Sequence, residues 1–184
     1  MKKPVILALS LIFLSISSWS QEDFGYKTHD IGAETQINAD GMAFILHLAM
    51  NTRIHHSLIL QGGYNHVSTR KVSPTGQEKG SGWGGAIGYR YYTGVIPKRF
   101  YIGVRATFWK MDIDWSTSIT KGTSKLNILQ PAVETGYTFL INEVFFITPY
   151  YMATQSIKLK TNGAEVQYGE GLSLQPGISA GFRF

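Results

Sequence analysis

Apolar and polar residues alternate with a period of two along most of this chain, in stretches of roughly ten residues. The last stretch is the clearest, because one face of residues 172–184 consists of Leu172, Leu174, Pro176, Ile178, Ala180, Phe182 and Phe184. Such alternation places successive side chains on opposite faces of a β-strand. The pattern predicts eight strands, at residues 31–38, 42–50, 57–69, 82–93, 100–110, 126–139, 144–157 and 172–184.

The connections between these strands alternate between short and long. Counting back from the C-terminus, the segments 140–143, 94–99 and 51–56 are short, whereas 161–170, 112–125 and 70–81 are longer and polar. Only the first hairpin, at 39–41, is short on the side of the long loops. This arrangement is typical of an up-and-down barrel with short periplasmic turns and long outer loops.

The distribution of charge between the two faces separates a membrane barrel from a soluble one. The polar face carries nearly all the charges, namely Glu34, His47, Arg90, Arg105, Glu134 and Arg183. A soluble barrel would turn this face outward and bury the apolar one, whereas a barrel in lipid does the reverse. Because the apolar face contains large aliphatic and aromatic residues almost throughout, we predict an eight-stranded antiparallel up-and-down transmembrane β-barrel spanning residues 31–184.

The N-terminus predicts export. Lys2 and Lys3 precede an apolar run over residues 5–16, and small residues follow before Gln21, which is the pattern of a cleaved signal peptide at 1–20. Residues 21–30 would then form a short periplasmic segment. An uncleaved N-terminal anchor is the alternative. The chain has no cysteine, which excludes a lipoprotein anchor and disulfides.

Charge removes one further class of function. The formal net charge is +5, and loss of Lys2 and Lys3 reduces it to 5 − 2 = +3, with the positive residues scattered along the chain. A nucleic-acid-binding protein needs a basic stripe, so no nucleic-acid partner is expected.

The signal peptide, the alternating strands and the terminal Gly-Phe-Arg-Phe at 181–184 resemble the small eight-stranded outer-membrane β-barrel family, the OmpA/OmpX-like membrane domains. The resemblance implies a place in the outer membrane of a Gram-negative bacterium and contact with outer-membrane lipid and lipopolysaccharide. It also implies that Phe182 and Phe184 act as the signal for the outer-membrane assembly machinery. A monomer is expected.

Eight strands leave an interior that side chains fill or that holds one small ligand. Because Glu34, Glu134, Arg90, Arg105 and Arg183 share the inward face and differ in sign, we predict an internal ion-pair network among them, with His47 as a further member of the interior polar network. The network would be a structural plug or, alternatively, the lining of a narrow porin-like channel.

Two motifs suggest chemistry. His66-Val67-Ser68 is partly similar to the His-x-Ser motif of lipid A deacylases, but no acidic residue obviously neighbours it. His55-His56 lies in a predicted turn and lacks the three or four convergent ligands of a metal site. We therefore predict a non-enzymatic barrel without cofactor or metal, in a structural or surface-interaction role; a lipid A-modifying hydrolase using His66 and Ser68 is the catalytic alternative.

Overall fold

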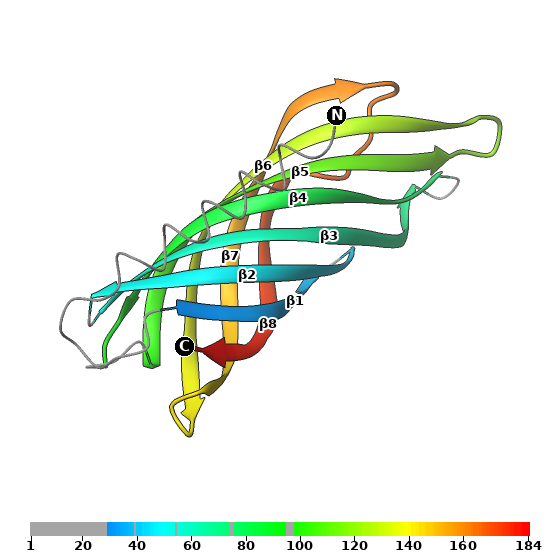
Figure 1. Cartoon of the computed structure of the whole chain (residues 1–184). Helices are drawn as coiled ribbons and strands as arrows, with labels where there is room; N and C mark the ends of the chain where they lie inside the picture. Colours follow the sequence, from blue (N-terminus) through cyan, green and yellow to red (C-terminus); the bar gives the residue numbers. More distant parts are fainter. Residues whose placement is uncertain (1–28, 39, 54, 74–75, 95–97) are drawn as a thin grey trace, which may run out of the picture.

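The computed structural model describes residues 29–38, 40–53, 55–73, 76–94 and 98–184, and eight antiparallel strands form a closed barrel in it (Figure 1). Each strand pairs with its neighbours in sequence, and β1 closes the ring against β8. The strands are β1 (His29–Asn38), β2 (Gly41–Arg53), β3 (His56–Ser73), β4 (Gly76–Tyr92), β5 (Arg99–Ser116), β6 (Lys121–Ile141), β7 (Phe145–Asn162) and β8 (Gly171–Arg183). The predicted fold class is confirmed.

The start of the chain bears on the predicted domain boundaries. The predicted signal peptide at 1–20 and most of the segment 21–30 lie outside the described residues. His29 and Asp30 belong to β1, so the barrel begins before the predicted position 31. Among the described residues, no helix is long and apolar enough to cross a membrane.

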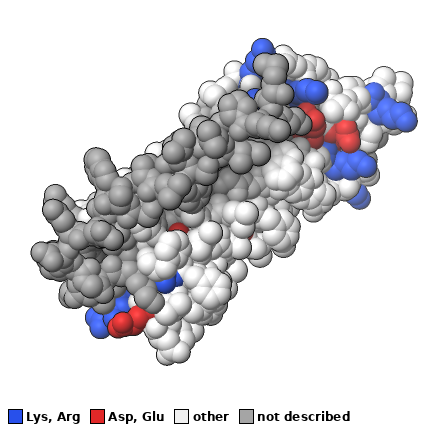
Figure 2. All heavy atoms as spheres, viewed as in Figure 1, with Lys and Arg blue, Asp and Glu red and all other residues white. Residues whose placement is uncertain are grey.

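The two faces of the barrel have the predicted polarity. Large apolar side chains point outward and are exposed on every strand, as Leu46 at 71% and Leu174 at 73% exposure illustrate. Pro131, Pro149 and Pro176 also face outward. The middle of the visible surface consequently carries few charges, whereas Lys, Arg, Asp and Glu gather towards the two ends (Figure 2).

The outer ends of the strands differ from the prediction. The predicted loops 70–81 and 112–125 are mostly strand. In the first, β3 extends to residue 73 and β4 begins at residue 76; in the second, β5 extends to residue 116 and β6 begins at residue 121. The two hairpins project beyond the rest of the barrel (Figure 1). Only the connection 163–170 is long. The prediction of loops here rests on the polar outward residues, which remove the lipid-facing side of the pattern. The inward side continues in β5, where Met111 and Ile113 are buried.

The interior is layered along the barrel. The inward face of β5 shows the order, with Tyr101 near the end of the barrel where β1 begins and β8 ends, Arg105 in the middle, and Trp109, Met111 and Ile113 towards the opposite end, here called the outer end. The outer part is an apolar cluster, hereafter the apolar plug, made of Ala43, Ile45, Val67, Trp109, Met111, Ile113, Leu126, Ile128, Val166 and Tyr168. A second cluster, nearer the end where β1 begins and β8 ends, consists of Tyr92, Tyr101, Ala132, Tyr150 and Met152.

Glycines on β4 make room for the large side chains of the plug. Gly84 pairs with Trp109, and a Cβ atom at Gly84 would lie 2.2 Å from a ring carbon of that tryptophan. Gly82 likewise pairs with Met111, and a Cβ atom at Gly82 would lie 2.5 Å from the sulfur of that methionine. The glycine-rich sequence of β4 is thus the complement of the bulky sequence of β5.

Candidate functional site: the filled barrel interior

Four charged side chains meet in the barrel interior and form what we call the charge cluster, Glu34, Arg90, Arg105 and Glu134. Arg105 Nη1 lies 2.7 Å from Glu34 Oε1, and its other terminal nitrogen donates to Glu134. Arg90 Nε lies 2.5 Å from Glu134 Oε1, and Arg90 Nη2 lies 4.0 Å from Glu34. Two carboxylates thus face two guanidinium groups, and the cluster carries no net charge.

Neutral donors complete the shell around Glu34. Tyr150 donates its hydroxyl at 2.6 Å, Gln36 its amide at 2.6 Å and Gln61 its amide at 3.0 Å. Arg90 in turn lies over the ring of Tyr101, 4.5 Å from its centroid. A buried carboxylate needs this degree of hydrogen bonding to offset its lost hydration.

Sheet register explains why Arg90 and Glu134 meet. They lie on β4 and β6 and both pair with Gly103 on the strand between them. A Cβ atom at Gly103 would lie 3.1 Å from the Cγ atoms of both Arg90 and Glu134, so the missing side chain lets the two chains reach each other across β5.

Two residues of the predicted network stand apart from the charge cluster. Arg183 makes a bidentate pair with Asp30 at the end of the barrel where β1 begins and β8 ends, at 2.6 and 2.7 Å. Arg183, predicted to share one ion-pair network with Glu34 and Glu134, therefore pairs with a residue outside the predicted set. His47 is buried and makes no ion pair in the described part of the chain; its ring centroid lies 5.8 Å from that of Phe146.

The segment 163–170 covers the outer end of the apolar plug. Val166 and Tyr168 are buried in it. The backbone N–H groups of Gln167 and Tyr168 donate to the carboxylate of Glu78 at 2.8 and 3.1 Å, and Arg70 bridges Glu78 and Asp40. Burial raises the pKa of Tyr168 to about 12. This long connection is thus folded against the barrel.

The residues of the catalytic alternative lie elsewhere. His66 and Ser68 are exposed on the outward face of β3. Within the described residues, no hydrogen bond or ion pair joins His66 to Ser68 or to a carboxylate. His55 and His56 contact the Tyr92 carbonyl oxygen and the Tyr89 hydroxyl, respectively, rather than converging on one point.

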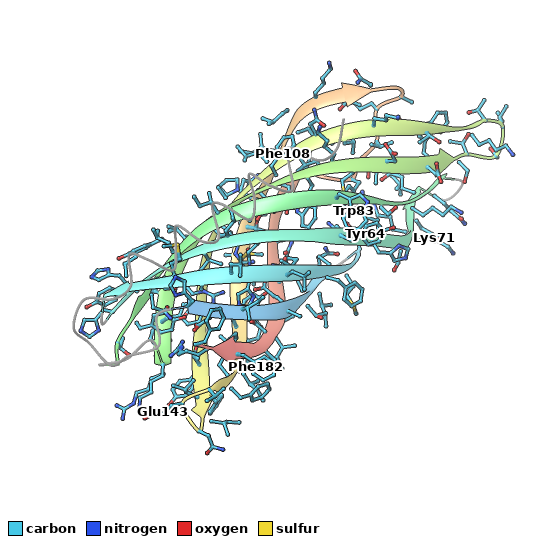
Figure 3. All side chains as sticks on the ribbon, in the orientation of Figure 1. Tyr64, Lys71, Trp83, Phe108, Glu143 and Phe182 are labelled. Carbon is cyan, nitrogen blue, oxygen red and sulfur yellow. The ribbon has the colours of Figure 1, made fainter. Side chains whose placement is uncertain are left out.

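The two terminal aromatic residues proposed as an assembly signal face outward beside the barrel seam. Phe182 is 58% exposed and its ring lies 5.7 Å from that of Phe145. Phe184 stacks on His29, and the backbones of these two residues exchange hydrogen bonds at 2.9 and 3.0 Å. The C-terminus is therefore held in the ring beside β1 (Figure 1), and Figure 3 shows Phe182 on the last strand.

Several residues of the site were missed from the sequence. Tyr150 lies in a strand whose aromatic residues occur on both faces, so its inward direction was hidden. Glu78 was placed in a loop, and Asp30 before the barrel. Glu78 lies an even number of residues before Arg90 on β4, so it belongs to the same inward face. Continuing the alternation of β4 towards the outer end of the barrel would have identified it.

Comparison with known proteins supports the fold. No family model and no curated protein matches the chain. The N-terminal β-barrel domain of OprF from Pseudomonas aeruginosa is 15% identical, with a TM-score of 0.51 over 88% of this chain and 100% of that domain. The attachment invasion locus protein Ail of Yersinia pestis, bound to the heparin analogue sucrose octasulfate, is 13% identical, with a TM-score of 0.51 over 85% of this chain and 97% of that one.

The translocator domain of the autotransporter NalP from Neisseria meningitidis is 9% identical, with a TM-score of 0.52 over 98% of this chain and 97% of that domain. At such identities the likeness concerns the fold alone. Taken with the closed ring of eight strands and its apolar outer face, it shows that the chain has the fold of the small outer-membrane β-barrels.

Proposed function

We propose that this protein is an integral outer-membrane β-barrel with a sealed interior, exported through a cleaved signal peptide, whose role is structural or surface-interactive rather than conductive or enzymatic. The observation that carries the proposal is the filling of the interior. The charge cluster occupies its middle, the apolar plug its outer part, and the segment 163–170 covers the plug. Ions cross a dry apolar constriction poorly, because hydration is lost there without compensation.

Conductance in planar bilayers tests the sealed interior. The refolded full chain is first shown to be folded by its altered gel mobility without boiling. We expect no unitary current steps in concentrated KCl. A stable single-channel conductance from the folded protein would contradict the proposal and favour the porin-like channel.

The non-enzymatic part of the proposal rests on the surroundings of His66 and Ser68. A serine hydrolase needs a base that reaches the nucleophile and a third group that orients the base. The described residues supply no acidic partner to His66. Mass spectrometry of lipid A from cells with and without the protein should give identical spectra; loss of an acyl chain that depends on Ser68 would overturn this part.

A further inference from the structure

The outward faces of three adjacent strands change from apolar to polar at one boundary near the outer end. On β5 the last apolar outward residue is Phe108 and the next outward residue is Lys110. On β6 the corresponding step is from Leu129 to Asn127. On β7 the apolar outward series runs through Ile157 and Leu159. The register shifts there by one residue, because Ile128 pairs with Lys158 whereas Asn127 pairs with Lys160, so the exposed Lys160 is the next residue on the outward side.

Sheet register brings the first polar residues beyond this boundary together. Lys110 pairs with Asn127, and Asn127 pairs with Lys160. Residues that pair directly in a sheet point to the same side, and strands lie about 4.8 Å apart, so the two lysines start roughly 10 Å from each other. Lys125 lies two residues further out on the middle strand, on the same face.

The charge of these lysines is not neutralised locally. Lys110, Lys125 and Lys160 are exposed, and no ion pair joins any of them to a carboxylate in the part of the chain that the structure describes. Asp112 lies opposite Lys125 in the register. The group therefore carries three positive charges and one negative charge on a single outward surface.

The position of the group on the barrel indicates its ligand. Apolar residues just below it contact acyl chains if the barrel lies in a bilayer, and the headgroup layer begins where those residues end. Phosphate groups of a lipid lie in that layer. Flexible lysines that extend from the boundary with an amide donor between them have the geometry to bind such a group.

We infer that Lys110, Asn127 and Lys160, assisted by Lys125, form a binding site for the phosphate of an outer-leaflet lipid headgroup. The inference rests on the proposed function, because it requires the apolar band to lie in the membrane. It assigns to the outer surface of β5, β6 and β7 a partner of defined chemistry, a phosphorylated lipid whose chains lie against Phe108, Leu129 and Ile157.

Binding of lipid A to the full chain in detergent, measured by native mass spectrometry, tests the site. The probes are diphosphorylated lipid A and its fully dephosphorylated form. The variant is Lys110→Gln with Lys160→Gln, and the matched control is Lys71→Gln with Lys79→Gln, which removes two exposed lysines from β3 and β4 at the same end. Altered gel mobility without boiling shows that each variant is folded, which separates loss of the site from loss of the barrel.

We expect the diphosphorylated lipid to bind better than the dephosphorylated form. Its affinity should fall about 25-fold in the Lys110 and Lys160 variant, since each lysine near a phosphate layer contributes about fivefold. The control should retain wild-type affinity. Equal binding of the dephosphorylated lipid, or an equal loss in the control, would overturn the site. Displacement of lipid A by an equal concentration of inorganic phosphate would overturn the assignment to a lipid.

Discussion

At the scale of single residues, the charge cluster depends on the completeness of its pairing. Removing one member of a buried ion pair leaves an opposite charge without compensation, which costs about 3–5 kcal/mol of folding free energy. Glu134 is 2% exposed and accepts from both arginines. We expect Glu134→Gln to lower the free energy of unfolding by this amount, measured by denaturant titration of the protein refolded into lipid vesicles.

The matched control for that measurement is Glu165→Gln, since Glu165 is exposed in the segment 163–170 and makes no ion pair among the described residues. Its effect should be close to zero, as for most surface substitutions. Equal stabilities of the Glu134 variant and the wild type would show that the cluster adds nothing to folding.

The inward glycines of β4 give a second prediction at this scale. An added methyl group at Gly84 meets Trp109 at 2.2 Å, whereas at Gly62, which faces outward on β3, the nearest atom would be 4.0 Å away. Overpacking a core costs about 1–3 kcal/mol. Gly84→Ala should therefore lower the denaturant midpoint, and Gly62→Ala should not; the reverse order would mean that the faces of these strands are misassigned.

Prediction of single residues from the sequence succeeded where it required only knowing which side chains point into the barrel. Glu34, Arg90, Arg105 and Glu134 were selected because they share the inward phase, and the barrel brings them together. The alternation pattern could not predict which residues form ion pairs with each other, because this depends on the register between strands. Arg183 pairs with Asp30 across the seam between β8 and β1, and the pattern of one strand carries no information about that register.

At the scale of elements, Glu78 holds the segment 163–170 against the barrel through hydrogen bonds. It accepts two backbone N–H groups of that segment while Tyr168 is buried in the apolar plug. We expect Glu78→Ala to release the segment and so lower the pKa of Tyr168 from about 12 towards its ordinary value of 10. The measurement is the ultraviolet absorbance of tyrosinate during an alkaline titration, taken as the difference from a Tyr168→Phe reference in each background.

The sign of the linkage follows from the raised pKa. Tyr168 stabilises the docked segment fully below pH 10, and this contribution is lost as the pH rises through about 12. Glu165→Ala is the control and should leave the titration of Tyr168 unchanged. If Tyr168 still titrates near 12 in the Glu78 variant, Glu78 does not hold the segment.

The strand boundaries show where prediction from the sequence ends at this scale. Within the apolar band the predicted faces hold on the seven strands for which the sequence defines them, since contact with lipid on one side and a filled interior on the other enforces alternation. The strand predicted at 144–157 has aromatic residues in both phases, so its faces come from the structure. Beyond the band both faces of the β3–β4 hairpin are largely polar, so little contrast remains there in the sequence. On β5, by contrast, the alternation continues, with Met111 and Ile113 inward and Asp112 and Asp114 outward, but its outward face is now polar. Backbone pairing extends these strands, as the register from Lys79 with Asp114 to Gln77 with Ser116 shows. Side-chain contacts such as the hydrogen bond from Thr123 to Asp114 join them as well.

At the scale of the whole molecule, the barrel reverses the polarity of a soluble protein. Its interior holds buried charges, and its exterior exposes a continuous apolar band bordered by aromatic pairs such as Tyr64 and Trp83, whose ring centroids lie 4.9 Å apart (Figure 3). In water such an exterior would cause aggregation. The fold is therefore stable only where lipid or detergent covers the band.

The band itself can be tested by placing a charge at different depths. Val104 is 54% exposed in the middle of the outward face of β5, and Ser116 is exposed at the end of the same strand. A lysine at the bilayer midplane costs about 2–4 kcal/mol and one near or beyond the interface costs about 0–1 kcal/mol. In vesicles, Val104→Lys should lower the free energy of unfolding by the larger amount and Ser116→Lys by little, because only the first charge is forced into hydrocarbon. Equal costs at the two positions would mean that the outward face of β5 does not lie in a membrane.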